Sequence, residues 1–174
     1  MAVTIDGAGP ITGLTSLASP TTLNGLTIPT TGFGKVLQVV SNTYATNIST
    51  TSTSFVTTGL TATITPSAAT SKIMVFINSP FRVTGTEGTA GYATVYRGTV
   101  AGTNLGTADG FGQVYQYITG EINDLLFPIS ILDSPATTSA QTYTFAMRSS
   151  SASLTVSTFM AVKKATITLM EISA

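Results

Sequence analysis

Apolar and polar residues alternate in short runs along most of this chain, from Gly34 onward. The clearest run is Gly59–Thr65, where Leu60, Ala62 and Ile64 alternate with threonines. A repeat of two residues is typical of a β-strand with one buried face. The sequence therefore predicts a strand whose three apolar side chains face a core.

Other runs of the same kind are rich in Val, Ile, Thr, Tyr and Phe, and clusters of Gly, Pro, Ser and Asn separate them. This composition favours strands joined by turns. The further predicted strands are Lys35–Tyr44, Ser71–Phe81, Ala93–Arg97, Gly112–Ile118, Pro128–Leu132, Thr142–Arg148, Leu154–Phe159 and Ala165–Ile172.

Two of these strands carry more specific expectations. The run from Ile73 to Ile77 is apolar on both faces, which indicates a strand in the centre of a sheet or at a subunit contact, and we expect regular pairing to falter at Pro80. In Thr142–Arg148 we expect alternate residues to point inward and outward. The inward set is Tyr143, Phe145 and Met147, and the outward set is Thr144 and Arg148.

Eight or nine strands at intervals of about ten residues predict an all-β protein, an antiparallel two-sheet β-sandwich. Eight strands fit a jelly roll, while the Cys-Trp-Cys pattern of immunoglobulin domains is missing because the chain has no Cys and no Trp. We expect residues 34–174 to form this sandwich. Long glycine-rich loops are expected at Gly85–Tyr92 and Gly98–Gly112, within residues 85–127, and such loops are a usual place for recognition.

Residues 1–33 follow neither a helical nor a strand period, as "TIDGAGPITGLTSL" (Thr4–Leu17) illustrates. We therefore expect an extended N-terminal arm ahead of the sandwich. Spaced apolar residues would be its anchors on a partner: Ile5, Ile11, Leu14, Leu17, Leu23, Leu26 and Ile28.

The composition of the chain argues against several classes of function. The chain has thirty-five threonines and eighteen serines but no His and no Cys, so the usual general base near neutral pH, the thiolate nucleophile and the usual zinc ligands are missing. Seven basic and seven acidic residues cancel, and they form no basic patch for nucleic acid or an anionic membrane. No apolar run is long enough to span a bilayer, and the expectation is a soluble protein made in the cytoplasm. A surface so poor in charge suits permanent contact with other subunits.

The remaining candidate sites are weak as patterns. Asp133-Ser134-Pro135 is ordinary turn chemistry, because no base exists to activate the serine. Glu121, Asp124 and Asp109 lack the glycine-punctuated spacing of a calcium loop, so neither a metal nor a cofactor is expected. Four tyrosines could stack on sugar rings or equally pack in the core or at a subunit interface: Tyr92, Tyr96, Tyr115 and Tyr117.

Four stretches resemble a widespread family of short structural proteins of tailed bacteriophages, many of them marine or cyanobacterial. The stretches are "GKVLQVV" (Gly34–Val40), Thr51–Asn78 with "TPSAATSKI", Leu132–Ser149 with "LDSP" and "TYT", and Ile167–Ala174 with "LMEI". The resemblance implies a jelly-roll module that forms homotrimers in the virion. Members of the family are head decoration proteins, tail-fibre tips and unassigned virion proteins.

These observations lead to three hypotheses. The first is a trimeric capsid decoration (cement) protein that is synthesised in the host cytoplasm and docks through its arm on the capsid exterior. Its partners would be the phage major capsid protein and neighbouring decoration subunits. The second is a tail-fibre or spike tip that binds a host-surface glycan through the 85–127 loops, although 33 residues leave no room for a shaft. The third, an enzyme such as a depolymerase, would need paired carboxylates, and the seven acids are too scattered to nominate a pair.

Overall fold

The computed structural model describes residues 22–23, 26–27, 35–158 and 163–173. The regular elements of this described part are strands. They are β1 (Thr22–Leu23), β2 (Leu26–Thr27), β3 (Val36–Tyr44), β4 (Ser49–Thr50), β5 (Val56–Ile64), β6 (Lys72–Gly85), β7 (Thr89–Arg97), β8 (Thr103–Asn104), β9 (Gly112–Gln116), β10 (Ile122–Asp133), β11 (Gln141–Ser149), β12 (Leu154–Ser157) and β13 (Ala165–Ile172). Within these residues we find no helix long and apolar enough to cross a membrane.

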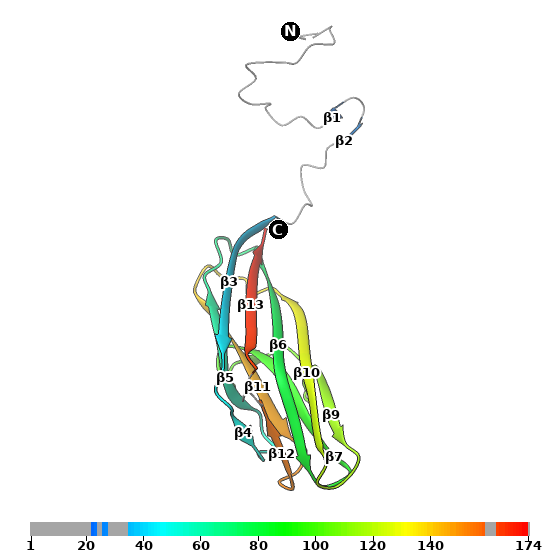
Figure 1. The fold of residues 1–174 in the computed structure, drawn as a ribbon. Coiled ribbons are helices and arrows are strands. Elements are labelled where there is room, and N and C mark those ends of the chain that lie inside the picture. Colours follow the sequence, from blue (N-terminus) through cyan, green and yellow to red (C-terminus); the bar gives the residue numbers. More distant parts are fainter. Residues whose placement is uncertain (1–21, 24–25, 28–34, 159–162, 174) are drawn as a thin grey trace, which may run out of the picture. The chain divides into compact units, whose positions relative to one another are not determined.

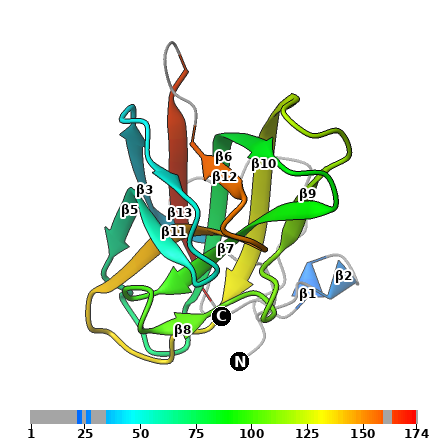
Figure 2. The same ribbon diagram turned by 90° about the horizontal axis from the view of Figure 1, so that it is seen from below.

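Two antiparallel sheets form a sandwich from residue 36 onward (Figures 1 and 2). The six-stranded sheet has the order β3-β13-β6-β12-β4, and β10 pairs with the other edge of β6. The five-stranded sheet has the order β5-β11-β7-β8, and β9 also pairs with β7. The long strands thus run β3-β13-β6-β10 in one layer and β5-β11-β7-β9 in the other, the arrangement of a jelly roll. The predicted fold class is confirmed, and each of the nine predicted strands overlaps an observed one.

The core lies between the two sheets and is apolar. Leu60, Ala62 and Ile64 are buried in it, as the alternation in this strand predicted. Tyr143, Phe145 and Met147 also point into the core and are completely buried. Thr144 lies on the outer face, as predicted, but it is buried there because the chain at Gly98 covers it, and its hydroxyl donates to the Gly98 carbonyl at 2.6 Å.

Strand β6 is central in its sheet, as the apolar run from Ile73 predicted, and pairs along its whole length with β10. The expected interruption at Pro80 is absent on this edge, where Pro80 lies opposite Leu126. On the other edge, β13 pairs with β6 as far as Asn78 and β12 pairs from Arg82 onward. Among the described residues, Pro80 therefore falls between two partner strands, where a missing N–H costs no ladder bond on that edge.

The predicted loop Gly85–Tyr92 is shorter than expected, because residues 86–88 alone connect β6 to β7. The predicted loop Gly98–Gly112 contains β8 and otherwise connects β7 to β9. Glycines in this region suggested a loop, but Gly91 lies within a strand for a packing reason. A Cβ atom on Gly91 would lie 2.6 Å from Cγ1 of Val83, so close approach between the sheets requires glycine there.

Candidate functional site

The predicted docking arm lies largely outside the described residues. This applies to Ile5, Ile11, Leu14, Leu17 and Ile28. Leu23 and Leu26 belong to β1 and β2, which pair antiparallel with these two residues opposite each other. The role of the arm therefore stays a prediction.

The four tyrosines of the alternative glycan site lie on strands β7 and β9 or directly after them. Tyr92 pairs with Gln113, and Tyr115 pairs with Ala90, so Tyr92 and Tyr115 share the outer face of the five-stranded sheet. Their strand neighbours Ala93 and Val114 are buried on the inner face. The structure thus brings residues from two strands to one surface, which the sequence could not show.

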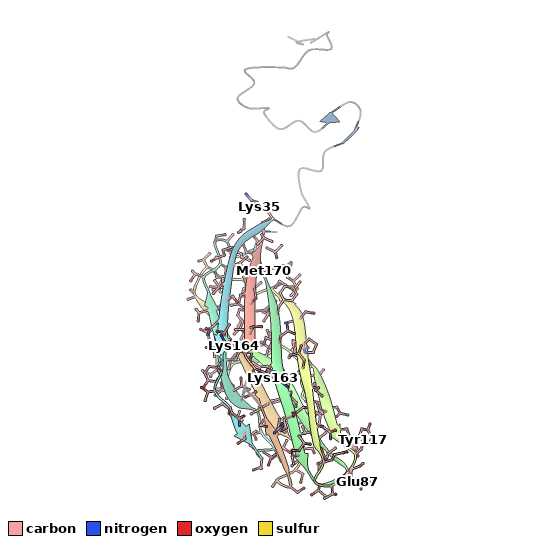
Figure 3. All side chains as sticks on the ribbon, in the orientation of Figure 1. Lys35, Glu87, Tyr117, Lys163, Lys164 and Met170 are labelled. Carbon is pink, nitrogen blue, oxygen red and sulfur yellow. The ribbon has the colours of Figure 1, made fainter. Side chains whose placement is uncertain are left out.

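Only some of these tyrosines offer a ring to a ligand. Tyr96 is 9% exposed, and its ring packs edge-on against Phe55 at a centroid distance of 6.0 Å. Tyr117 is 72% exposed and Tyr115 is 37% exposed, and their ring centroids lie 4.8 Å apart. Figure 3 labels Tyr117 near one end of the sandwich, close to Glu87. An exposed aromatic pair of this kind can stack on the apolar face of a sugar.

The connection that carries Tyr117 is held by the side chain of Gln116, which is completely buried. Its amide nitrogen donates to the carbonyl groups of Ile118 at 2.6 Å and Glu121 at 2.8 Å. Its amide oxygen accepts a hydrogen bond from Asn123 at 2.8 Å. Because all three bonds cross the β9–β10 connection, the backbone beside the tyrosine pair has a fixed conformation.

A groove of about 330 Å³ lies beside Tyr92 on the same outer face. Its lining includes Asp109, Phe111 and Gln113. The guanidinium carbon of Arg148 lies 4.0 Å from the Tyr92 ring centroid, and Arg148 also pairs with Asp109 at 2.5 Å. Arg148 therefore covers a face of the Tyr92 ring in a cation–π contact, and its ion pair engages Asp109, an acid that lines the groove.

The "LDSP" motif, which the sequence predicted only to form a turn, contains a buried carboxylate. Asp133, the last residue of β10, accepts a hydrogen bond from the Tyr143 hydroxyl at 2.8 Å. Arg97 donates to both of its oxygens, at 3.0 and 3.2 Å. Burial, then the hydrogen bond to Asp133, raises the pKa of Tyr143. Since Tyr143 and Arg97 belong to the five-stranded sheet, these bonds join the two sheets.

The "LMEI" motif contains a second buried carboxylate, for which the sequence predicted no role. Glu171 accepts hydrogen bonds from the backbone N–H and hydroxyl of Ser67, at 2.7 and 2.6 Å, and from Gln38 at 2.6 Å. Burial raises the pKa of the Glu171 carboxyl, but these hydrogen bonds outweigh it and lower the pKa to about 2. Glu171 thus ties the β5–β6 connection to β3 and β13.

The three acids weighed for calcium do not gather in one place. Asp124 pairs with Arg82 at 2.5 Å, and its hydrogen bond to Arg82 lowers its pKa. Asp109 pairs instead with Arg148, and Glu121 is exposed. Across the residues that the structure describes, no three acidic, His or Cys side chains lie close enough together to hold a metal ion.

Comparisons with known proteins found likeness only among solved structures. No protein-family model matches the chain, and no curated protein matches it. A mutant VP2 protein of infectious bursal disease virus in derived T=1 particles is 16% identical, with a TM-score of 0.40, over 78% of this chain and 36% of that one. The structure of the Gt strain of the same virus is 15% identical, with a TM-score of 0.39, over 84% and 43%. The chain therefore spans less than half the length of these viral chains.

Proposed function

We propose that this protein is a structural subunit of a tailed-bacteriophage virion. In this proposal it is a homotrimeric decoration protein on the capsid exterior, and residues 1–33 dock on the major capsid protein and neighbouring decoration subunits. The supporting observation is the place of the family-like stretches in the fold. They supply β5 and β11, most of β13 and the first halves of β3 and β6, which are framework strands of both sheets.

The two motif acids strengthen this argument. Asp133 joins the sheets through Tyr143 and Arg97, and Glu171 anchors the β5–β6 connection. Asp133 and Glu171 both belong to the family-like stretches, and their hydrogen bonds help to stabilise the jelly roll. A shared framework of this kind supports a shared fold, while the attachment to a particle falls to other parts of the chain.

The mechanism proposed for attachment is docking of the N-terminal arm. An arm without a core of its own loses conformational entropy when it binds. Burial of its spaced Leu and Ile side chains, together with strand pairing at an exposed edge, would offset that loss. A protein that binds the assembled shell and not its separate subunits stabilises the shell by linkage.

The experiment compares the full chain with a chain that begins at Gly34, each added to undecorated phage heads. We expect the full chain to bind the heads and the shortened chain to stay folded by circular dichroism but not bind. A finer pair is Leu14→Asp with Leu17→Asp, which should weaken binding, against Thr15→Asp as the matched control. If the shortened chain occupied the heads as fully as the full chain, docking through the arm would be refuted. If labelled full chain were found on the tail of the phage, the proposed position on the head would be refuted.

A second candidate function is the tip of a tail fibre that binds a host-surface glycan. The observation in its favour is that Tyr115 and Tyr117 form an exposed ring pair on the same sheet face as the groove beside Tyr92. A glycan array with the full chain tests it. Saturable binding that Tyr117→Ala abolishes, and that Thr63→Ala at the β5 edge of the same sheet leaves intact, would support this function over decoration.

A further inference from the structure

The outer face of the six-stranded sheet carries apolar side chains aligned across four strands. Strands β3, β13, β6 and β10 lie side by side (Figure 1). Residues directly opposite each other form one apolar row: Val39, Met170, Met74 and Leu132. Their strand neighbours, such as Val75 and Leu169, are buried in the core, so the row points away from it. Val39 is 54% exposed and Leu132 is 47% exposed.

The neighbouring rows continue this surface, which we call the outer face. On one side of the apolar row, Val36 and Ile172 lie opposite each other, and Lys72 follows on β6. On the other side lie two rows that contain Phe76 and uncharged polar groups. These rows are Ser41, Thr168, Phe76 and Ser130, and then Thr43, Thr166, Asn78 and Pro128.

Charge on the outer face is confined to its margins. Lys72 is its one charged member and donates a hydrogen bond to the Ser134 hydroxyl at 3.0 Å. Beyond the last row, Arg82 pairs with Asp124, and the charge of Lys163 contributes to the lowered pKa of Asp124. In Figure 3, Lys35 is labelled at one end of the strands, Met170 comes next, and Lys163 and Lys164 lie farther along. The centre of the outer face is therefore apolar or hydroxyl-bearing.

We infer that the outer face surrounds the symmetry axis of the homo-oligomer and packs against the same face of neighbouring copies. This inference rests on the proposed homotrimer and names its contact surface. Near a symmetry axis each side chain meets a copy of itself, so a charged group there would face an identical charge. Apolar side chains meet their copies without such repulsion, and a hydroxyl can both donate to and accept from its copy.

The outer face is large enough for part of such a contact. Strands about 4.8 Å apart and rows about 6.7 Å apart give four strands and four rows an area of roughly 500 Å². Around a threefold axis three such faces would bury roughly 1,500 Å² in total, or about 500 Å² for each pair of copies. Because a specific interface buries about 1,000 Å² or more, the surface at the margins of this face would also contribute to each contact.

The test measures the mass of the full chain in solution by light scattering after size exclusion. We expect an oligomer, and we expect Met74→Lys and Val39→Lys to weaken association by about a hundredfold or more, since each places like charges together. The matched control is Thr63→Lys, an exposed residue on the outer face of the other sheet, which should keep the oligomer. Circular dichroism checks that each variant is folded.

A second measurement uses the lack of cysteine in this chain, which makes any introduced thiol unique. Under mild oxidation, at least one of Val39→Cys, Met74→Cys and Leu132→Cys should form covalent dimers, because a disulfide needs Cα atoms about 4.4–6.8 Å apart. Thr63→Cys should not. An unchanged mass for both lysine variants, or no cross-link from the apolar row, would overturn this inference and leave the homotrimer standing.

Two other outcomes separate this inference from the proposed function. A monomeric full chain would overturn both the contact and the homotrimer, but not attachment to a virion. If removal of residues 1–33 dissociated the oligomer while both lysine variants kept it, the arm would make the contact and the outer face would not. Binding to undecorated phage heads is measured separately for each variant.

Discussion

The buried Glu171 carboxylate gives a prediction about stability and pH. Its pKa lies at about 2 in the folded protein, against an ordinary value of 4.5. A difference of roughly 2.5 pKa units corresponds to about 3 kcal/mol. Since the folded pKa is the lower one, this stability is present above pH 4.5 and is lost as the pH falls through about 2.

The perturbation is Glu171→Gln, which keeps the size of the side chain but removes the charge. The glutamine oxygen can still accept from Ser67, while its NH₂ group faces the amide nitrogen of Gln38, which already donates to the Thr65 carbonyl at 2.7 Å. We expect the variant to lose about 3 kcal/mol at pH 7. The difference in the free energy of unfolding between the wild type and the variant should fall to about 1.5 kcal/mol at pH 3, because the wild-type chain has by then lost much of the stability that the charged Glu171 contributes.

The assay is urea unfolding at both pH values, followed by far-UV circular dichroism because the chain has no Trp. Protein concentration is held constant, so that any oligomer contributes equally. The matched control is Glu87→Gln, at an exposed acid, which should leave the free energy of unfolding unchanged at both pH values. A gap between wild type and Glu171→Gln that is the same at pH 7 and pH 3 would refute the reasoning.

Three further predictions concern the sandwich. Tyr143→Phe should cost about 1.5–3 kcal/mol in urea unfolding, because it removes a hydrogen bond to the buried Asp133 carboxylate, while Tyr117→Phe should cost nothing measurable. Gly91→Ala should lower stability by about 1–3 kcal/mol through overpacking against Val83, and an unchanged unfolding midpoint would contradict the close approach of the sheets. Asp124→Asn should shift the unfolding midpoint much less than Asp133→Asn, since its ion pair with Arg82 is open to solvent, and equal shifts would argue against the cross-sheet role of Asp133.

Local pattern was enough to predict the strands and the inward face of several. Leu60, Ala62 and Ile64 alternate with threonine, and their burial follows from the two-residue repeat alone. The strand Ala165–Ile172 was predicted with its observed bounds. In contrast, the first half of β10, from Ile122 to Phe127, has no alternation in the sequence and is a strand because it pairs with the far half of β6.

The sequence by itself determined an all-β chain, a shortage of catalytic residues and a surface poor in charge, because these depend on composition and on neighbours along the chain. Only the tertiary structure decided which residues meet. Asp133 reached Tyr143 and Arg97 by the packing of two sheets, and the apolar row formed through strand register between segments as far apart as Val39 and Met170. Register and sheet packing join residues that are distant in sequence, so no local repeat encodes them.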